Sequence, residues 1–368
     1  MKILIVIQCA NQGGMEQVTC NSAALLRDRG HEVRILSLRV LNGMEQLCAR
    51  EGIPIEALRR YHRAGGILDI PVLLRHIRRI APDRVWVVGH NIGAVVAGRL
   101  SGIPTFLSIH YHHAESPMWK WRIFYGIAQY CCRKIHFVSH FIFGEVKMLF
   151  HRPEQCCVFH NCLFEPKPGW RSLSARRRWN LPSGVPVVGN AGWLIPRKAF
   201  DVFLQTAAII AARRPEVCFL IAGSGSEECT LKALADELGI AGHVVLTGWL
   251  REMDDFWSSV DLLLFNTRFD CFPTTPIEAF ARGIPVVASV EQCGLNEIMT
   301  DGLDGRLFSS HNPALLAKAV LGMLALPDDR CRAITDHAKQ QVERLCAPGV
   351  HLKHLTAFLL LQPEKEAQ

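Results

Sequence analysis

Short apolar, β-branched runs alternate with amphipathic stretches along most of this chain. This alternation is typical of α/β proteins, in which each strand is followed by a helix that packs on a parallel sheet. The strands expected in the first half are residues 3–7, 32–38, 84–88, 105–109 and 134–139. The helices expected between them are residues 15–29, 72–80 and 92–101. Gly30-His31 fits the end of one helix and the start of the next strand.

The same alternation starts again in the second half. The strands expected there are residues 185–190, 216–222, 244–247 and 261–265. The expected helices are residues 200–213, 229–237, 253–259 and 315–326. The pattern therefore predicts two successive doubly wound Rossmann-like domains, and ligands of such sheets bind outside the carboxyl ends of the strands.

The domain boundary is expected in the segment 165–170, which is rich in Pro and contains Gly. We predict a first domain over residues 1–165 and a second over 166–346. A helix near residues 347–362 is a candidate to pack back on the first domain, and the tail 362–368 has a disordered composition.

Length and composition fit this picture. A chain of 368 residues with 49% hydrophobic and 20% charged residues is long enough for two packed cores. No apolar run reaches the roughly 20 residues of a membrane-spanning helix. The first apolar residues are followed at once by Gln8, Asn11 and Gln12 without a small-residue cleavage pattern, which favours a buried strand over a signal peptide.

The 14 cysteines include adjacent pairs but no C-x-x-C spacing. Zinc sites use such spacings, so no metal site is expected. Scattered cysteines without an export signal indicate reduced thiols and a cytoplasmic location.

The net charge of +7 is concentrated in the first half. Residues 1–165 contain twenty Lys and Arg against twelve Asp and Glu, whereas the remainder contains twenty-one against twenty-two. An anionic partner or surface is therefore expected on the first half. Trp119, Lys120, Trp121 and Arg122 fit an amphipathic helix on the inner face of an anionic membrane. The aromatic core of an ordinary helix remains the alternative.

The most informative segment is residues 270–289, which reads as a loop, a helix, a Gly-Pro break and an apolar strand. Asp270 precedes the helix and Glu278 lies inside it. Pro276 suits the first helical position, where a missing N–H costs nothing. A helix N-terminus attracts phosphate through its unpaired N–H groups and its dipole. An anion held there, with an acid on either side, suits a sugar nucleotide.

Glycine loops follow two of the expected strands. Gly13-Gly14 opens a helix after the first strand, and Gly223-Ser224-Gly225 follows a strand of the second half. Glycines let the backbone approach a ligand closely. A simple tight turn explains Gly13-Gly14 equally well, and taken alone Gly223-Ser224-Gly225 is better explained as a turn. None of these loops reads G-x-G-x-x-G, which argues against a dinucleotide dehydrogenase.

Cations and histidines complete the candidate chemistry. Arg197 and Lys198 follow a strand and precede a helix, where two cations can neutralise a diphosphate. A solvated surface pair is the alternative. His110 ends an apolar strand and is expected to face the ligand side of the sheet. His112 and His113 follow it, but a metal site is not favoured because Glu115 is the one carboxylate nearby.

With these residues in place, the chain resembles the retaining glycosyltransferases of family 4, which have the GT-B fold. The similarity runs from Met1 to about Ala325 and keeps the order of the family's motifs. The matching segments are Gly13-Gly14-Met15-Glu16 with residues 25–33, then 158–161, 192–201, 220–225, 244–248, the Asp270 and Glu278 pair, and 294–305. The implied architecture is two Rossmann-like domains that face each other across a deep cleft.

The resemblance also implies roles for individual residues. Lys198 would neutralise the donor diphosphate, Glu278 would accept hydrogen bonds from the ribose, and His110 would lie beside the transferred sugar. Asp270 would hold the sugar together with the backbone that follows it. The further donor-binding residues implied are Gly13, Gly14, Arg197, Gly223, Gly225, Gly248, Cys271, Phe272, Pro273, Thr274 and Thr275.

Three positions depart from the family pattern. Trp193 stands where many members have an Arg, and Arg197 is a candidate substitute for the missing cation. Ala199 replaces a Gly after the Lys. Asp270 replaces a Glu that is one methylene longer. These differences bear on the identity of the donor sugar.

The expected function is that of a retaining, metal-independent hexosyltransferase without a cofactor. The expected donor is a UDP-sugar, with GDP- and ADP-sugars as alternatives, and no nucleic-acid partner is expected. The acceptor would be a hydroxyl of a saccharide or lipid-linked glycan, as in the synthesis of cell-envelope polysaccharide or lipopolysaccharide. Two other hypotheses remain: a GT-B sugar-nucleotide epimerase, and a non-catalytic scaffold that binds saccharide at a membrane.

Overall fold

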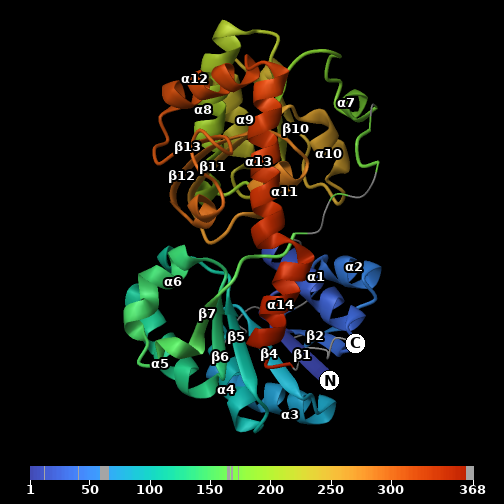
Figure 1. The fold of residues 1–368 in the computed structure, drawn as a ribbon, viewed down its shortest axis with the longest axis vertical. Coiled ribbons are helices and arrows are strands. Elements are labelled where there is room, and N and C mark those ends of the chain that lie inside the picture. The colour runs from blue at the N-terminus through green and yellow to red at the C-terminus, as the bar shows by residue number, and fades with distance from the viewer. Residues whose placement is uncertain are drawn as a thin grey trace. The chain divides into compact units, whose positions relative to one another are not determined.

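The computed structural model describes residues 1–11, 13–39, 41–58, 66–163, 166, 169–172 and 174–361. The chain forms two compact units (Figure 1). Unit 1 comprises Met1–Phe164 and Leu345–Gln368, and unit 2 comprises Glu165–Arg344. Residues 165, 167 and 168 of the expected linker, the tail 362–368 and Gln12 lie outside the described residues.

Unit 1 contains a parallel sheet in the order β3-β2-β1-β4-β5-β6-β7. Its strands are β1 (Lys2–Ile7), β2 (Glu32–Ser37), β3 (Ile55–Ala57), β4 (Arg84–Val88), β5 (Thr105–Ile109), β6 (Lys134–Phe137) and β7 (Cys156–Val158). Its α-helices are α1 (Gly14–Asp28), α2 (Met44–Arg50), α3 (Ile70–Ile80), α4 (Ile92–Leu100), α5 (Met118–Cys131), α6 (His140–Val146) and α14 (Pro348–Phe358). The strand order reverses between β1 and β4.

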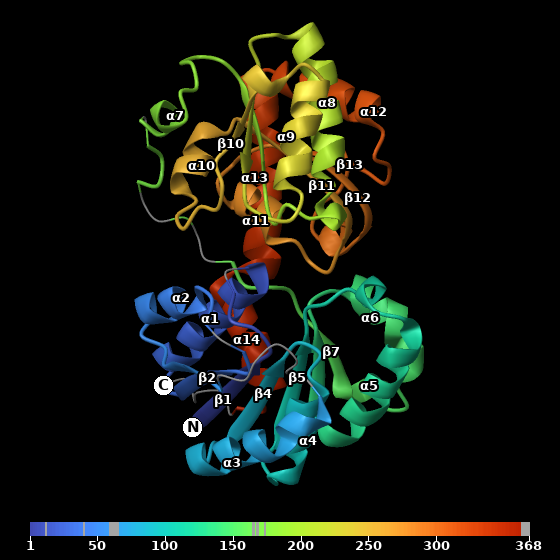
Figure 2. The same ribbon diagram turned by 180° about the vertical axis from the view of Figure 1, so that it is seen from behind.

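One face of this sheet is covered by α1, α2 and α14, whose apolar side chains share a core with β1, β2 and β4. Helices α3, α4 and α5 neighbour one another in sequence order, as Figure 2 shows. Burial of strands on both faces explains their nearly continuous apolar sequence.

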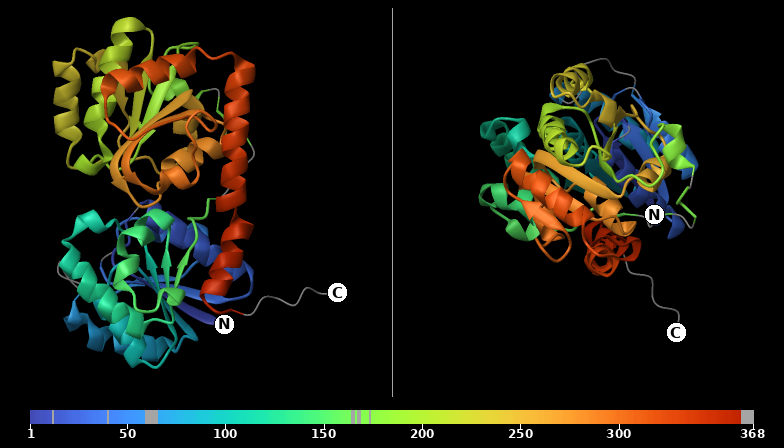
Figure 3. Two further views of the ribbon diagram at one scale, coloured as in Figure 1. Left: turned by 60° about the vertical axis from the view of Figure 1, so that its left-hand side comes forward. Right: turned by 90° about the horizontal axis from the view of Figure 1, so that it is seen from above.

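The C-terminal helix α14 belongs to unit 1 and lies beside α1 (Figure 3). Its His351 forms hydrogen bonds with Ser22 Oγ at 2.9 Å and with the carbonyl oxygen of His160 at 3.0 Å. Phe358 contacts Phe106 edge to face, with ring centroids 5.4 Å apart. Buried polar and aromatic contacts therefore fix this helix on the first half of the chain.

Unit 2 contains a second parallel sheet, in the order β10-β9-β8-β11-β12-β13. Its strands are β8 (Val187–Ala191), β9 (Cys218–Ala222), β10 (Val244–Leu246), β11 (Leu262–Asp270), β12 (Val286–Cys293) and β13 (Arg306–Phe308). Its α-helices are α7 (Ala175–Arg178), α8 (Phe200–Arg213), α9 (Glu228–Glu237), α10 (Asp254–Ser259), α11 (Thr274–Ala281), α12 (Pro313–Leu324) and α13 (Asp328–Cys346), which ends in unit 1. Here the order reverses between β8 and β11.

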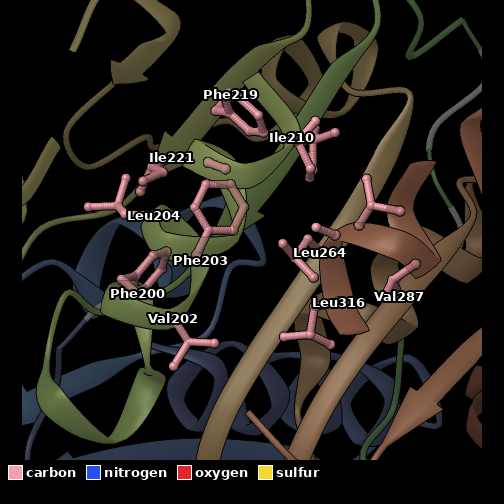
Figure 4. Packing of buried hydrophobic residues seen from close by; sticks show 14 of the residues in the cluster. Phe200, Val202, Phe203, Leu204, Ile210, Phe219, Ile221, Leu264, Val287 and Leu316 are labelled. Carbon is pink, nitrogen blue, oxygen red and sulfur yellow. The ribbon is translucent and has the colours of Figure 1, made fainter. Parts of the chain in front are cut away.

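The core of unit 2 lies between this sheet and the helices α8, α9 and α12. Figure 4 shows Phe200 and Phe203 of α8 beside Phe219 and Ile221 of β9. The rings of Phe203 and Phe219 are perpendicular, with centroids 6.1 Å apart. Two parallel α/β units confirm the predicted fold class.

Two local predictions at the start of the segment 270–289 were wrong. Strand β11 continues to Asp270 rather than ending at residue 265, because its pairing with β12 extends as far as Asp270 opposite Cys293. Helix α11 begins at Thr274, so Pro276 is its third residue rather than its first. Proline is tolerated there because the first four N–H groups of a helix have no partner within the helix.

Candidate functional site

The reversal of strand order in unit 2 brings Lys198 and Asp270 together. Lys198 ends a short 3-10 helix, η5 (Pro196–Lys198), that follows β8, and Asp270 ends β11. Lys198 Nζ donates a hydrogen bond to Asp270 Oδ2, and Arg197 Nη1 lies 3.8 Å from the same oxygen. The side chains of Lys198 and Asp270 are only 14% and 13% exposed. A largely buried ionic cluster thus occupies the point where such sheets bind ligands.

The pKa of Asp270 reflects two opposing effects. Burial raises the pKa, but the charges of Lys198 and Arg197, with the hydrogen bond from Lys198, lower it further than burial raises it. The backbone N–H of Cys271 also donates to Asp270 Oδ1 at 2.9 Å. Asp270 is therefore ionised at neutral pH, and it holds the two cations beside the carboxyl end of the sheet.

The end of β11 also holds η5 in place. Arg268 donates to the carbonyl oxygen of Pro196 and, at 2.7 Å, to Asp201 Oδ2. Thr267 Oγ1 donates to the carbonyl oxygen of Arg197 at 3.2 Å. Ala199 closes the turn in a left-handed conformation with φ of 51°, which a Gly adopts without strain. The family's Gly at this position therefore has a conformational reason.

Helix α11 starts four residues after Asp270. Pro273 is its N-cap residue in an extended conformation, and Thr275 Oγ1 donates to the carbonyl oxygen of Ala191 at 3.2 Å. The hydrogen bond fixes the start of α11 at the end of β8. Cys271 and Phe272 are buried, whereas Thr274 is partly exposed. The helix N-terminus thus lies beside the ionic cluster, four residues after Asp270.

Glu278 lies inside α11 and is also held by its neighbours. Trp257 Nε1 of α10 donates to Glu278 Oε2 at 3.2 Å. Burial raises the pKa of Glu278, and the charge of Arg282 and the hydrogen bonds from Trp257 and Thr274 partly oppose this. Trp257 could not be recognised from the sequence as a partner of Glu278, because an aromatic ring on a helix is normally part of the core.

The glycines of the second half allow loops to pack closely. A Cβ atom at Gly223 would lie 1.9 Å from the carbonyl oxygen of Gly192, and one at Gly225 would lie 2.3 Å from that of Leu194. The N–H of Gly223 donates to the carbonyl oxygen of Gly248 at 2.9 Å. These contacts give Gly223 and Gly225 a packing role whether or not they touch a ligand.

In unit 1, Gly13 and Gly14 stand at the start of α1, on the edge where β1 and β4 diverge. The carboxylate of Glu16 accepts hydrogen bonds from its own backbone N–H and from those of Asn11 and Gly13, and burial raises its pKa. This buried side chain satisfies part of the helix N-terminus at which the resemblance places the donor-binding residues Gly13 and Gly14.

His110 follows β5 as predicted, and its ring lies 6.1 Å from that of His136 on β6. Burial lowers the pKa of His110 to about 3, with a smaller contribution from His351. Its imidazole is therefore neutral at physiological pH. His113 has different partners: its Nδ1 is hydrogen-bonded to Glu145 Oε2 and its Nε2 to the Tyr125 hydroxyl, each at 2.8 Å. In the described part of the chain, no group of three or more His, Cys, Asp or Glu is arranged to hold a metal ion.

The predicted membrane-facing residues divide into two groups on α5. Trp119 is 59% exposed, and Lys120 and Arg122 are exposed as well. Trp121 is only 2% exposed, and its Nε1 donates to the carbonyl oxygen of His113 at 2.9 Å. The prediction for Trp121 was wrong, because the helical phase turns this residue towards the core.

Comparison with known families agrees with the motif order. The profile described as "Glycosyltransferase Family 4" matches residues 12–163, and the profile "Glycosyl transferases group 1" matches residues 173–341. The two matches together cover nearly all of both units. The chain belongs to glycosyltransferase family 4.

Curated relatives of this family 4 chain carry different names. The D-inositol 3-phosphate glycosyltransferase of Thermobispora bispora is 32% identical over 216 residues, which are 54% of this chain and 49% of the relative. The lipopolysaccharide core biosynthesis glycosyltransferase LpsE of Rhizobium meliloti is 28% identical over 150 residues, 41% of this chain and 43% of the relative. The chain thus spans about half the length of these relatives, or less.

Solved structures show that the family 4 chain has the GT-B fold. Anabaena Alr3699/HepE, crystallised with UDP and glucose, superposes with a TM-score of 0.85 at 18% identity, over 98% of this chain and 100% of that one. WaaG, a glycosyltransferase involved in lipopolysaccharide biosynthesis, gives a TM-score of 0.73 at 15% identity, over 97% and 99%. Across the described residues, none of the helices has the length and apolar character that a bilayer crossing requires.

Proposed function

We propose that this protein transfers a hexose from a nucleoside-diphosphate sugar to a hydroxyl group, with retention of the anomeric configuration. The observation that carries the proposal is the cluster of Lys198, Arg197 and Asp270 at the strand reversal of unit 2, beside the N-terminus of α11. Two cations and a helix dipole converge there on a position that suits a diphosphate.

In the proposed reaction, the leaving diphosphate develops negative charge as the glycosidic bond to the sugar breaks. Lys198, Arg197 and the N–H groups that start α11 would stabilise that charge, a role that often supplies a large part of catalysis. These protein groups take the role of a metal ion, so the proposed reaction uses no metal and no cofactor. Asp270 and Glu278 would bind hydroxyl groups of the donor rather than act as nucleophiles.

The acceptor hydroxyl would attack from the face that the diphosphate leaves, and an oxygen of the leaving phosphate would take its proton. His110 would contribute a neutral imidazole, since burial keeps its pKa at about 3. Such a ring donates one hydrogen bond and accepts another, which suits contact with a sugar hydroxyl.

The proposed acceptor is a saccharide or lipid-linked glycan at an anionic membrane surface. On α5, the side chains of Trp119 and Ile123 are 59% and 53% exposed, and the cations Lys120 and Arg122 on the same helix are exposed as well. Exposed apolar side chains among cations suit the headgroup region of a bilayer. The names of LpsE and WaaG refer to lipopolysaccharide, which supports this acceptor class.

A donor panel tests the proposal. The purified protein is incubated with UDP-, GDP- and ADP-hexoses, first alone and then with saccharide acceptors, and the released nucleotide and the anomer are followed by NMR. We expect turnover of one donor, a UDP-sugar first among those tested, with retention. Lys198→Ala should abolish turnover, whereas Lys232→Ala should not, since Lys232 is exposed and pairs only with Glu228 among the contacts described.

Other outcomes would identify other functions. Inversion at position 2 of the sugar would indicate an epimerase. Absence of turnover with all donors, together with tight binding to vesicles, would indicate a scaffold. Turnover by Lys198→Ala at the wild-type rate would refute the proposed site.

A further inference from the structure

Two tryptophans of unit 2 form a pair at the carboxyl edge of its sheet. Trp193 follows β8 and Trp249 follows β10, with ring centroids 4.7 Å apart and ring planes inclined by 30°. Trp249 is 37% exposed, and Trp193 is partly exposed. A large aromatic pair open to solvent is unusual for residues that serve only to fill a core.

The pair spans three strands. Strand β9 lies between β8 and β10, so the two indoles meet across the loop that follows β9. That loop is bonded on both sides: Leu194 N–H donates to the carbonyl oxygen of Ser224, and Gly223 N–H donates to that of Gly248, both at 2.9 Å. The tight contacts of Gly223 and Gly225 leave these loops little freedom. The two indoles are therefore carried by loops whose backbone is held in place by hydrogen bonds and close packing.

The position of the pair relative to the ionic cluster is defined by the sheet. Lys198 lies where β8 and β11 diverge, and β10 lies two strands beyond β8 on the other side. Adjacent strands are about 4.8 Å apart, so Trp249 follows a strand about 10 Å from β8. A nucleotide bound by its phosphates at Lys198 has its base separated from them by the ribose. A base that extends along this edge reaches the indoles.

We propose that Trp193 and Trp249 form a stacking platform for the nucleobase of the donor. This inference rests on the proposed function and adds to it the residues that recognise the base. Trp193 stands where many family members have an Arg, so a ring face replaces a guanidinium at this position. Every nucleobase has a π-face, so the platform adds affinity for any nucleotide through its base and independently of its phosphates. Hydrogen bonds elsewhere in the site would select among the bases.

The test compares nucleotides with pyrophosphate, which has the charge but lacks the base. Binding of UDP, GDP, ADP and pyrophosphate is measured by calorimetry for the wild type, Trp193→Ala, Trp249→Ala and Trp249→Phe. Stacking of one base on an aromatic side chain corresponds to roughly a five- to hundredfold gain in affinity. We expect a loss of this size for nucleotides in Trp249→Ala, recovery of most of it in Trp249→Phe, and unchanged binding of pyrophosphate.

The control is Tyr130→Ala, which removes an aromatic side chain of unit 1 that is 67% exposed and should leave nucleotide binding unchanged. Equal losses for nucleotide and pyrophosphate would show that the indoles only support the loops, and would overturn the platform. Unchanged nucleotide affinity in both alanine variants would overturn it too. If the wild type binds no nucleotide and turns over no sugar nucleotide, the proposed function itself fails.

Discussion

The pairing of Lys198 with Asp270 predicts a measurable energetic coupling between these two residues. Both side chains are about six-sevenths buried, and Lys198 donates directly to Asp270. At an effective dielectric constant of 20, two unit charges about 4 Å apart attract by about 4 kcal/mol. Loss of one partner from a buried pair costs about 3–5 kcal/mol. Because Arg197 also lies 3.8 Å from Asp270, we expect Lys198→Ala to cost about 2–4 kcal/mol of unfolding free energy.

The assay is a double-mutant cycle with Lys198→Ala, Asp270→Asn and the combined variant. Urea unfolding at pH 7 is followed by tryptophan fluorescence. The double variant should be more stable than the sum of the single losses predicts, by about 1–3 kcal/mol. The matched control is the cycle for Lys232 and Glu228, whose side chains are 56% and 36% exposed and whose coupling should stay near 0.5 kcal/mol.

The same pair fixes the sign of a pH effect. The pKa of Asp270 is lowered in the folded state, so its contribution to stability is present above the unfolded pKa, near 3.9. That contribution disappears as the pH falls through the folded pKa.

A coupling no larger than that of the control pair at pH 7 would refute the argument that this cluster is an interacting, largely buried unit.

Three further predictions concern other parts of the molecule. Changing Lys120 and Arg122 to Glu should lower the affinity for vesicles that contain anionic lipid at least about tenfold, since each cation near such a surface contributes about 1 kcal/mol to binding. Unchanged binding in a sedimentation assay would contradict the proposed membrane contact. Burial lowers the pKa of His351 to about 4. Between about pH 6.5 and 4, this histidine therefore binds a proton in the unfolded chain but not in the folded chain. The free energy of unfolding consequently decreases as the pH falls through this range. His351→Gln should therefore lose less stability than the wild type from pH 7 to pH 5 in urea titrations, by about 1–2 kcal/mol, and equal losses would contradict the assignment. Ala81 is exposed with φ of 47°, so Ala81→Gly should raise the unfolding free energy by about 0.5–1 kcal/mol, and a lower melting temperature would contradict this.

The alternation of strands and helices could be predicted from the sequence because it follows from burial. Strands covered on both faces must be apolar throughout, and the helices that cover them must be amphipathic. The same reasoning failed at the end of β11, where residues 266–270 are mostly polar or charged and the pattern predicts no strand. These residues form a strand because β12 supplies hydrogen-bond partners along its length, which a local pattern does not reveal.

Candidate site residues could be named one by one from the sequence, but the contacts between them could not. Asp270 and Lys198 were assigned separate roles because they are 72 positions apart, and only the order of strands in unit 2 brings them together. Trp121 shows the opposite case. Its neighbours Trp119 and Lys120 are exposed, but one further step of a helix turns a side chain by about 100° and buries it.

The charges of unit 2 connect the ionic cluster with the tryptophan platform. Lys198 and Arg197 supply two positive charges, and Asp270 removes one of them, so the cluster has a net charge of +1 with which to meet a diphosphate. The N-terminus of α11 adds about half a charge. With Trp193 in place of the family's Arg, electrostatics alone leaves the diphosphate undercompensated, and stacking of the base supplies part of the affinity instead. The part of the nucleotide affinity that comes from stacking should not change with salt, because stacking is not screened, whereas the part that comes from the cations should weaken. Trp193→Arg should bind pyrophosphate more tightly and depend more strongly on salt, and a variant that changes neither would show that this position does not face the donor.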